Sequence, residues 1–266
     1  MSAGYDYDKL SVELRPVLAG LVAKDNLENS NQYYKEPEFH ETIYTKYIKR
    51  LLDILIALVA VIVSFPINVV VLVVTYFDVG RPVLFRQQRV AKDGKLFTMV
   101  KFRNMTNAKD ENGVLLRAEQ RVTRWGKLMR STSLDELLNF YNILKGDMSI
   151  IGPRPLPLSY RDRFNRYHSV RHAVRPGLDC PLRDPSKLMT WQNRLDNDAW
   201  YAEHVSFKTD MILLFLLVHE TLFGRDKKAR ARGFGEGSFI GYNKDGTVMD
   251  SNHIPEEYYL KLKEEG

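Results

Sequence analysis

The stretch from Arg130 to Pro155, RSTSLDELLNFYNILKGDMSIIGPRP, holds the densest set of side chains in this sequence that could do chemistry. Asp135 and Glu136 are adjacent carboxylates, and the apolar spacing around them predicts that a helix begins here. The first backbone N–H groups of a helix are unpaired and the helix dipole is positive at that end, so an ionised carboxylate is favoured. An ionised aspartate can attack as a nucleophile, which makes covalent catalysis by Asp135 one interpretation.

The same residues also fit a purely structural pattern. Ser133 and Glu136 form the S-x-x-E sequence of a capping box, in which the glutamate side chain accepts a hydrogen bond from the serine backbone N–H. Glu136 would then stabilise the start of the helix and take no part in a reaction. The residues alone leave both interpretations open.

Two arginines lie directly before prolines, Arg154 in GPRP and Arg175 in RPG. A residue before proline is held in an extended conformation, so these side chains project from rigid loops. The guanidinium fork matches two oxygens at once, which suits the phosphates of a diphosphate. Phosphate-binding glycine loops of the G-x-x-x-x-G-K-[ST] and G-x-G-x-x-G types do not occur, and the histidines show no metal-ligand spacing.

The elements that would position these residues are of mixed type. PVLFRQQRV and KLFTMVKFRNM alternate in polarity around Lys92, Asp93 and Gly94, which predicts a β-hairpin. A helix is predicted from Leu134. The apolar run MILLFLLV, residues 211–218, is too short to cross a membrane and is either a core helix or a helix on the membrane surface.

A longer uncharged run, residues 54–76, would reach about 34 Å as a helix and is long enough to cross a bilayer. It begins well inside the chain and lacks a small-residue cleavage site, so we do not expect a cleaved signal peptide. Membrane attachment is therefore predicted to be permanent.

Pro66 lies in the middle of this run, beside Ser64 and Asn68, and predicts a kink or break. One interpretation is a helix that enters the bilayer, breaks at Pro66 and returns to the same leaflet, with the neighbouring polar side chains satisfying freed carbonyls. The other is a kinked transmembrane helix. Asp53 is either a buried partner of a preceding basic residue or an interfacial carboxylate. Both flanks are basic, so loop charge sets no orientation for a single crossing. The basic residues are Lys46, Lys49 and Arg50 before the run, and Arg81, Arg86, Arg89, Lys92 and Lys95 after it.

Composition narrows the class of protein. The 266 residues include 39 Lys plus Arg against 33 Asp plus Glu, and the first 43 residues are net acidic, so the remainder is strongly basic and suits phosphate-rich partners. A hydrophobic content of 44% excludes a disordered chain. The single cysteine, Cys180, excludes a disulfide framework and fits a reducing compartment. The basic and Gly-rich C-terminal end shows little sign of a second core.

The succession KRLLDILIAL with an embedded proline, FRQQRV, KFRNM, SLDELLNFYNILKGDMSIIGPRP and RPG resembles the bacterial monotopic phosphoglycosyl transferases, the bacterial sugar transferase family, from about Tyr47 to Phe223. Later positions of that pattern are matched by Trp191, Asp198 and Tyr201. The resemblance implies an α/β fold class: a membrane-anchored, compact mixed α/β catalytic domain with an N-terminal re-entrant membrane helix and interfacial helices. The segments implied are an acidic polar N-terminal extension (1–43), a re-entrant helix broken at Pro66 (44–78), the catalytic domain (79–225) and a polar C-terminal tail (226–266).

The reaction implied by the resemblance is transfer of a sugar 1-phosphate from a nucleoside diphosphate sugar, expected to be a UDP-sugar, to polyprenyl phosphate. A nucleoside monophosphate would be released, and the step would open the membrane stage of glycan or exopolysaccharide synthesis. Asp135 would be the nucleophile, forming a phosphosugar-aspartate, and a ligand of the cofactor Mg²⁺, with Glu136 as its catalytic partner. The residues implied in substrate binding are Lys101, Arg130, Asp147, Arg154 and Arg175.

The resemblance also implies a place in the cell and a set of partners. The location would be the bacterial inner membrane, with the catalytic domain on the cytoplasmic face. The partners would be the sugar donor, the lipid acceptor and downstream glycosyltransferases, with no nucleic acid. Two departures concern the site: Phe65 stands where the family often has serine before the membrane proline, and LDCPLR follows RPG where the family often has I-T-G-W-A-Q.

A function of a different class is a membrane-tethered basic module that binds anionic lipid or nucleic acid without catalysis. The basic body of the chain allows it. It explains neither the adjacent carboxylates Asp135 and Glu136 nor the rigid GPRP and RPG loops. A donor-hydrolysis assay separates this alternative from the transferase.

Overall fold

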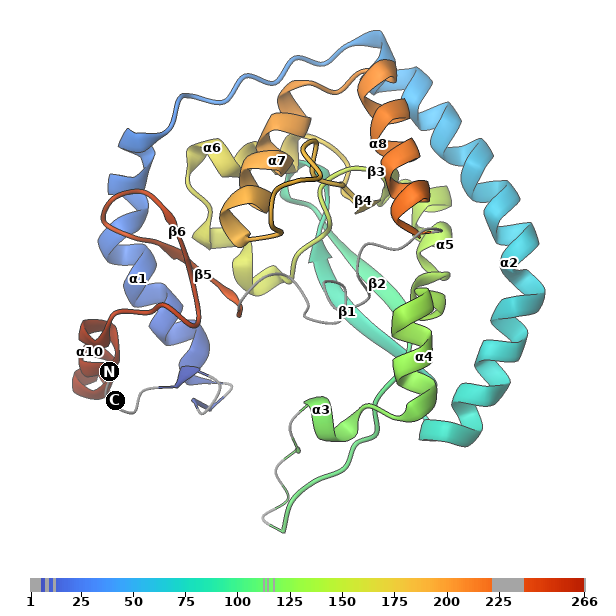
Figure 1. The fold of residues 1–266 in the computed structure, drawn as a ribbon, viewed down its shortest axis with the longest axis horizontal. Helices are drawn as coiled ribbons and strands as arrows, with labels where there is room; N and C mark the ends of the chain where they lie inside the picture. Colours follow the sequence, from blue (N-terminus) through green and yellow to red (C-terminus); the bar gives the residue numbers. More distant parts are fainter. Residues whose placement is uncertain are drawn as a thin grey trace. The chain divides into compact units, whose positions relative to one another are not determined.

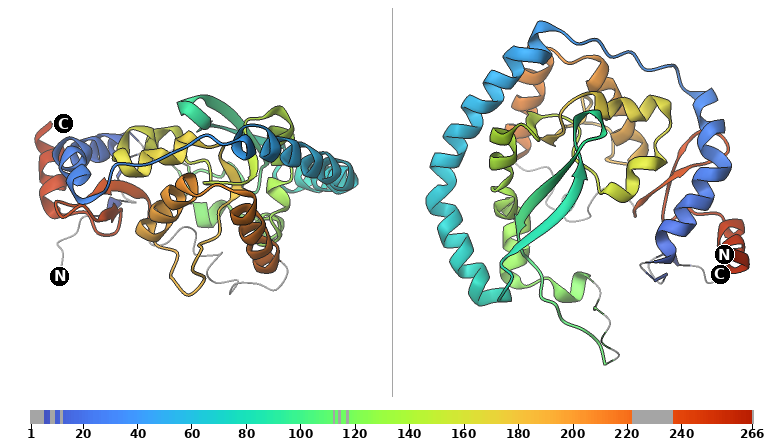
Figure 2. Two further views of the ribbon diagram at one scale, coloured as in Figure 1. Left: turned by 90° about the horizontal axis from the view of Figure 1, so that it is seen from above. Right: turned by 180° about the vertical axis from the view of Figure 1, so that it is seen from behind.

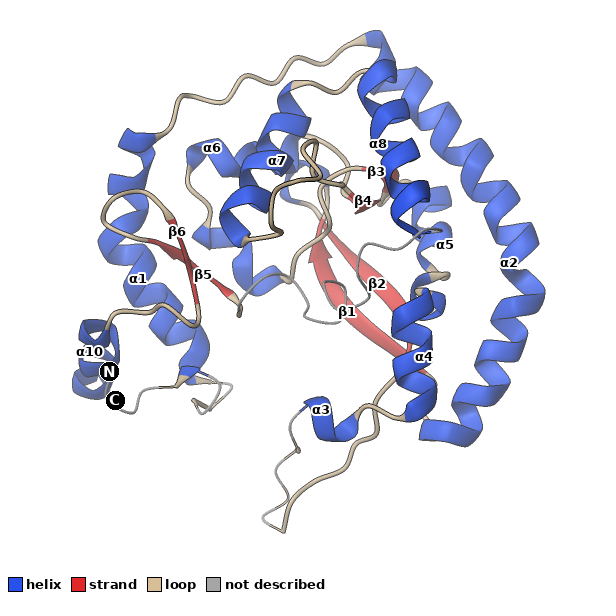
Figure 3. Ribbon diagram, in the orientation of Figure 1, coloured by secondary structure: helices blue, strands red, loops and turns tan. Residues whose placement is uncertain are grey.

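The computed structural model describes residues 6–265 except 8–9, 12, 112, 114, 117 and 222–236. The chain divides into two compact units, and each is described by itself. We call Ile43–Arg89 with Leu96–Ile150 the helix unit. We call Met1–Thr42 with Val90–Lys95 and Ile151–Gly266 the termini unit, because it holds both ends of the chain. The secondary structure is mixed, with short strands among longer helices (Figure 3), as the sequence predicted.

The helix unit is dominated by α2, which runs from Lys49 to Val79 after the π-helical turn Tyr44–Ile48. The segment Tyr44–Val79 is long and apolar enough to cross a membrane. The sequence predicted a kink or a break at Pro66, and the resemblance implied a break. The helix instead continues through Pro66 and is drawn as one curved ribbon (Figure 1).

Polar side chains lie beside the proline inside α2. Pro66 has no backbone donor, so the helix lacks one of its regular hydrogen bonds there. The Ser64 hydroxyl donates to the carbonyl of Val61 over 3.4 Å, and Asn68 donates to the Ser64 oxygen over 3.3 Å. Neither bond goes to the carbonyl of Ile62, four residues before Pro66, which is the one that the proline frees. The predicted use of Ser64 and Asn68 to satisfy that carbonyl is therefore not seen in these contacts.

The N-terminal end of α2 is bonded to other parts of the helix unit. Arg50 donates to the carbonyls of Ile143 and Leu144, over 2.5 and 2.8 Å. These carbonyls lie in the last turn of the helix Asn139–Lys145, where carbonyls have no partner within the helix. Asp53 is buried and accepts hydrogen bonds from the Ser149 hydroxyl and the Ile150 amide, over 2.9 and 3.0 Å. Neither interpretation of Asp53 from the sequence included these two partners.

The C-terminal end of α2 is bonded to the same unit. The Trp125 indole donates to Thr75 over 3.1 Å, and the Thr123 hydroxyl donates to Asp78 over 2.6 Å. Arg103 donates to the carbonyl of Val79, the last residue of the helix. Both ends of α2 are therefore fixed to one folded unit.

The predicted hairpin is confirmed. Strands β1 (Leu84–Val90) and β2 (Leu96–Phe102) pair, and the turn between them contains Asp93 at φ 58° and Gly94 at φ 71°. These left-handed conformations are the ones that glycine and aspartate tolerate best. The remaining elements of the helix unit are α3 (Ala118–Arg121), α4 (Arg124–Thr132), the 3-10 turn η5 (Leu134–Glu136) and α5 (Asn139–Lys145). The helix unit ends at Ile150, the second residue of strand β3 (Ser149–Ile151).

A small apolar core holds the helix unit together. Val71 of α2, Phe102 of β2 and Met129 of α4 are buried against one another. Trp125 and Leu134 pack against this group. The core places the end of β2 close to the turn that follows α4, which is where the predicted catalytic carboxylates lie.

The central part of the termini unit consists of short turns followed by two longer helices. In chain order these elements are η6 (Leu158–Arg163), α6 (Arg166–Ser169), η7 (Val170–Ala173), β4 (Gly177–Asp179), α7 (Trp191–Glu203) and α8 (Phe207–His219). Serine and threonine caps start the two helices: Thr190 accepts from the Asn193 amide and Ser206 from the Thr209 amide.

The two ends of the chain form a core of their own. The expectation of a polar extension and a polar tail with little sign of a second core was therefore wrong. The elements of this core are α1 (Leu14–Ser30), the turn Asn31–Tyr33, the antiparallel strands β5 (Phe239–Tyr242) and β6 (Val248–Asp250), and α10 (Glu256–Glu265). Figure 2 shows α1 beside β5, β6 and α10 in both views. The buried side chains include Leu18 and Val22 of α1, Ile240 of β5 and Tyr258 of α10. The basic cluster that begins at Lys227 lies within residues 222–236, which are outside the described residues.

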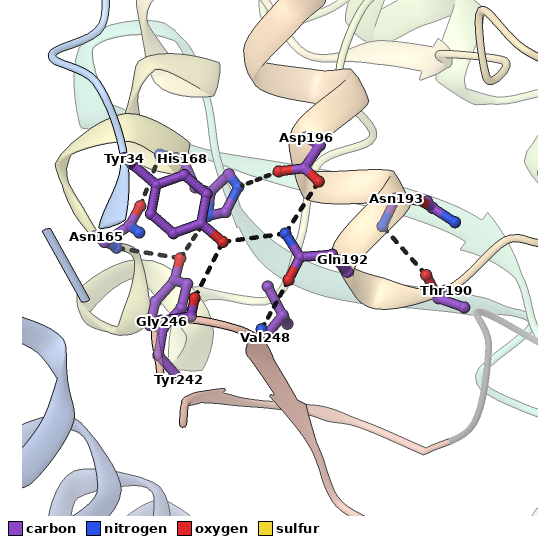
Figure 4. A network of polar contacts seen from close by, with 10 residues as sticks. All are labelled: Tyr34, Asn165, His168, Thr190, Gln192, Asn193, Asp196, Tyr242, Gly246 and Val248. Atoms are coloured by element: carbon purple, nitrogen blue, oxygen red, sulfur yellow. Dashed lines mark hydrogen bonds and ion pairs between the residues drawn. The ribbon is translucent and has the colours of Figure 1, made fainter. Parts of the chain in front are cut away.

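A polar network joins this core to α6 and α7 (Figure 4). The Tyr242 hydroxyl lies 2.8 Å from Nδ1 of His168, whose Nε2 lies 3.0 Å from Asp196. Gln192 donates to Tyr34 over 3.0 Å and to Asp196 over 2.9 Å. Burial lowers the pKa of His168 against the opposing effect of Asp196. His168 is therefore a buried side chain held by hydrogen bonds at both ring nitrogens.

Candidate active site

Lys101 and Glu136 form a close ion pair within the helix unit. The Lys101 ammonium, from β2, lies 2.6 Å from Oε1 of Glu136, from η5, and both side chains are about one-fifth exposed. Ser133 has a left-handed backbone and its side chain makes no capping hydrogen bond. The capping-box interpretation is therefore wrong, and Glu136 faces a cation from a strand 35 residues earlier in the chain.

Asp135 is buried beside this pair. Its Oδ2 accepts a hydrogen bond from the Asn104 side-chain amide over 2.9 Å, and the Asn104 oxygen accepts one from Arg130 over 3.1 Å. Arg130 lies in the last turn of α4. Asn104 thus connects the predicted nucleophile to one of the predicted phosphate-binding arginines.

The pKa of Asp135 is raised, mainly because burial disfavours the charged form and also because Glu136 is negative. Lys101 and Arg130 act in the opposite direction. The sequence predicted that the helix start would favour the ionised form, but burial has the larger effect. A carboxylate with a raised pKa is more basic once ionised, and its proton loss is promoted by any cation that approaches it.

Asn104 was missed by the sequence analysis, although it lies in the KFRNM stretch that carried the resemblance. Its position is set by close packing of α4 against its backbone. A Cβ at Gly126 would lie 2.1 Å from the Asn104 carbonyl oxygen, so only glycine fits there. A polar residue soon after a strand whose lysine is a site candidate is the sequence signal that could have identified it.

Asp147, the last predicted site residue of the helix unit, lies just beyond the C-terminal end of α5. Gly146 ends that helix at φ 97°, and the Asp147 carboxylate lies 3.6 Å from the Lys145 ammonium. Among the described contacts, Asp147 pairs with this lysine and not with Asp135 or Glu136. Its supporting role stays a prediction.

The termini unit brings the GPRP and RPG segments together. Gly177 donates its amide to the carbonyl of Pro153 over 3.0 Å, and a Cβ at Gly177 would lie 2.2 Å from the nitrogen of Gly152. The two backbones are therefore in direct contact, which only glycine at both positions permits. Arg154 and Arg175, predicted from separate motifs to bind phosphates, lie on these adjoining segments.

The Arg154 guanidinium is held by the second segment. It donates to the carbonyl of Leu178 in β4 over 3.3 Å. A small pocket beside it is lined by Arg154, Arg171, His172 and apolar residues. Burial and the nearby charges of Arg171 and Arg161 lower the pKa of His172 to about 3, so His172 is neutral and the arginines supply the positive charge.

The atypical loop after RPG is fastened to α7. Asn197 accepts a hydrogen bond from the Arg183 amide over 2.9 Å and donates to the carbonyl of Pro181 over 3.1 Å. Cys180, within this loop, is buried. The loop therefore has a defined structure built on α7, although its sequence departs from the pattern that the resemblance predicts.

Asp135 and its neighbours offer few donor atoms for a Mg²⁺ ion. Mg²⁺ binds one or two carboxylates and completes its shell with water and substrate phosphates. Among the described residues, no group of three or more His, Cys, Asp or Glu side chains could hold a metal ion. Asp135 offers a buried carboxylate, and Glu136 is paired with Lys101. These residues fit a Mg²⁺ ion shared with a substrate diphosphate, and not an ion held by protein alone.

Comparison with known proteins assigns the family. The bacterial sugar transferase family matches residues 44–224. The chain is 31% identical over 226 residues to a UDP-N-acetylgalactosamine-undecaprenyl-phosphate N-acetylgalactosaminephosphotransferase of Aeromonas hydrophila, covering 80% of this chain and 51% of that protein. It is 34% identical over 181 residues to the UDP-glucose:undecaprenyl-phosphate glucose-1-phosphate transferase of Klebsiella pneumoniae, covering 64% and 39%.

A further relative is the exopolysaccharide production protein PSS of Rhizobium leguminosarum bv. phaseoli, 33% identical over 206 residues, covering 70% of this chain and 98% of that protein. The match spans about half or less of the Aeromonas and Klebsiella proteins. The fold and the family match define a membrane-associated transferase. The chain belongs to the bacterial sugar transferase family, as the resemblance predicted.

Proposed function

We propose that the protein transfers a sugar 1-phosphate from a UDP-sugar to a polyprenyl phosphate such as undecaprenyl phosphate. The observation that carries the proposal is the buried Asp135, joined through Asn104 to Arg130 and adjacent to the Lys101–Glu136 pair. This group lies in the unit that contains the long apolar helix. The names of the Aeromonas and Klebsiella relatives describe transfers of this kind.

The proposed reaction has two steps, both at the sugar-bearing phosphorus. An oxygen of Asp135 attacks that phosphorus and forms an acyl phosphate. The phosphorus–oxygen bond to the second phosphate breaks, and nucleoside monophosphate leaves with the bonding electrons. An oxygen of the lipid phosphate then attacks the same phosphorus, which releases Asp135 and forms the polyprenyl-diphosphate-sugar. Splitting the transfer in this way is nucleophilic catalysis.

Cations are needed because the donor diphosphate and the nucleophile are both negative. Lys101 and Arg130 lie near Asp135 and would favour its ionised form. Arg154 and Arg175 would bind phosphate oxygens, as guanidinium groups do in bidentate fashion. Mg²⁺, held by Asp135 together with the donor, would neutralise charge on the diphosphate. Glu136 would keep Lys101 in place through their ion pair. Because the pair engages its carboxylate, Glu136 would not compete with Asp135 as a nucleophile.

We propose that α2 is re-entrant, with both ends at the cytoplasmic face of the inner membrane. A straight helix of 31 residues is about 46 Å long, so its ends would lie on opposite sides of a bilayer. Both ends of α2 instead make polar contacts within the helix unit, through Arg50 and Asp53 at one end and Thr75 and Asp78 at the other. A soluble unit that holds both ends is compatible with entry and exit through one leaflet.

Helix α8 is proposed to lie on the membrane surface. Leu213 is buried on one face, whereas Phe215 is 70% exposed, and Phe207 and Ile212 are more than half exposed. Exposed apolar side chains along one helix are typical of interfacial helices. Such a helix would hold the termini unit at the membrane surface.

The test uses the full chain in nanodiscs with undecaprenyl phosphate and a panel of nucleotide sugars. We expect one UDP-sugar to give a lipid-linked sugar diphosphate and UMP in equal amounts. The Asp135→Asn protein should fold and give neither product. If the wild type binds the membrane but gives no lipid-linked product with any donor, the non-catalytic membrane module is the better description. The product belongs to the class of acceptors that downstream glycosyltransferases extend.

A further inference from the structure

Arg171 is a buried arginine with two partners from other parts of the termini unit. It lies in η7 and is 3% exposed. One guanidinium nitrogen donates to the backbone carbonyl of Arg154 over 2.7 Å and to Oδ2 of Asp198 over 2.9 Å. Asp198 lies in α7 and is 1% exposed. Arg171 thus links three segments that are distant in the sequence.

A buried ion pair of this kind is costly to form, because both charges leave water. It is therefore weak evidence of a role in stability alone. The second bond of Arg171 goes to a residue between two prolines, Pro153 and Pro155, whose backbone has little freedom. Fixing that carbonyl fixes the direction in which the Arg154 side chain leaves the chain.

The same contact joins the two predicted phosphate-binding segments. Arg171 lies four residues before Arg175 in the RHAVRPG stretch. Its bond to the Arg154 carbonyl supplements the backbone contact between Gly152 and Gly177. Arg171 therefore helps to hold the two segments that carry Arg154 and Arg175 against each other.

We infer that Arg171, held by Asp198, is a positioning residue that sets the place of Arg154 for binding a nucleoside diphosphate group. The inference rests on the proposed function, in which Arg154 contacts donor phosphates. Arg171 acts through Arg154 and need not touch the substrate. A misplacement of about 1 Å in a positioned group can lower a reaction rate about a hundredfold. Disturbing Arg171 should therefore have a measurable effect.

The test is a double-mutant cycle between Arg171→Lys and Arg154→Ala, with UDP as the probe and calorimetric titration of the full chain in nanodiscs as the readout. Lysine keeps the charge but cannot reproduce the planar guanidinium that spans both acceptors. We expect each single change to weaken UDP binding on the order of tenfold to a hundredfold, which is the size of the loss of one charged hydrogen bond. The double variant should bind no more weakly than Arg154→Ala, because residues that act through one group are not additive.

A control separates positioning from loss of stability. Phe164 packs under the Arg171 guanidinium at 5.2 Å and is buried, but it takes no part in the two hydrogen bonds. Phe164→Leu should lower the thermal midpoint and leave the UDP affinity within about twofold of wild type. If Arg171→Lys lowers only the thermal midpoint, as this control does, the inference is overturned.

Losses that multiply in the double variant would also overturn it, because Arg171 would then act independently of Arg154. If Arg171→Lys does not fold, Asp198→Asn enters the same cycle, since asparagine keeps the size and removes the charge that holds Arg171. Wild-type UDP affinity in Asp198→Asn would contradict the inference. A wild-type chain that does not bind UDP contradicts the proposed function itself. If the wild type binds UDP and the losses of affinity multiply in the double variant, only the role of Arg171 is contradicted.

Discussion

Asn104 donates its side-chain amide to Oδ2 of Asp135 over 2.9 Å and accepts a hydrogen bond from Arg130 over 3.1 Å. This arrangement fixes one oxygen of the proposed nucleophile and ties its orientation to an arginine on α4. Asn104→Ala should therefore lower kcat on the order of a hundredfold with a small change in stability, because the carboxylate keeps its charge but loses its orientation.

Asn104→Ser, which keeps a shorter hydrogen-bonding group, is the matched comparison. It should recover part of the lost rate. Steady-state transfer assays on the two variants, with thermal unfolding as a control, check this expectation. Equal rates for Asn104→Ala and wild type would show that the bond to Asp135 has no part in the reaction.

Asp135→Asn should abolish transfer and also stabilise the fold at neutral pH. The raised pKa means that the native state holds the Asp135 proton more tightly than the unfolded chain does. The favourable contribution is complete below the unfolded pKa of 3.8 and is lost as the pH rises through the raised native value. Asparagine does not ionise and avoids this loss.

The gain in thermal midpoint from Asp135→Asn should accordingly be larger at pH 8 than at pH 4, in buffer without Mg²⁺ or donor. A difference of a few degrees corresponds to about 1 kcal/mol in a chain of this size. Calorimetry or circular dichroism at the two pH values provides the comparison. A gain independent of pH would mean that burial does not raise the pKa of Asp135.

Tyr242→Phe should destabilise the termini unit without changing catalysis. The Tyr242 hydroxyl lies 2.8 Å from His168 and accepts the Asn165 amide over 3.2 Å, both in buried surroundings. Removing it leaves these groups without a partner, at a cost of about 1–3 kcal/mol. Tyr33→Phe, at an exposed position, is the control and should have no effect.

Thermal unfolding and kcat/KM measured on the same two proteins check this expectation. A fall in kcat/KM for Tyr242→Phe at a temperature where the protein is folded would show that the core of the two chain ends affects the active site.

The topology of α2 is tested by cysteine labelling from the two sides of the membrane. His40 and Arg86 are exposed positions that precede and follow the apolar helix in the sequence. Cys180 is buried, so its background labelling should be low. If α2 is re-entrant, His40→Cys and Arg86→Cys should both react only from the cytoplasmic side. Labelling from opposite sides would mean that α2 spans the membrane.

Pro66→Leu restores the missing backbone donor and should straighten α2. The change should strain the contacts at its two ends, made by Arg50 and Thr75 among others. We expect part of the Pro66→Leu population to expose Arg86→Cys on the far side.

The sequence predicted the hairpin correctly because its evidence is local. Alternating side chains and the residues Asp93 and Gly94, which tolerate left-handed backbone, lie within a few positions of one another. The same local reasoning was wrong for Glu136. The S-x-x-E pattern indicated a cap, but Lys101, far away in the sequence, provides a stronger partner than the Ser133 amide.

The core of the two chain ends could not be predicted for a similar reason. Leu18 and Val22 read as one face of an isolated helix, and Ile240 and Tyr258 lie in short, mostly polar stretches. Only the fold brings them together. The expected ionisation of Asp135 likewise rested on the helix start, whereas its burial depends on β2 and α4, which no pattern around Asp135 reveals.

The central claim is that Asp135 forms a covalent bond to the phosphosugar, and donor-only incubation tests it most directly. The full chain is mixed with Mg²⁺ and the UDP-sugar that supports transfer, without lipid acceptor, and is quenched at short times for intact-protein mass spectrometry. We predict release of one UMP per protein and a mass increase equal to one sugar phosphate, located on Asp135 and absent in Asp135→Asn. No UMP release and no adduct before the acceptor is added, followed by full transfer once it is present, would contradict the covalent mechanism.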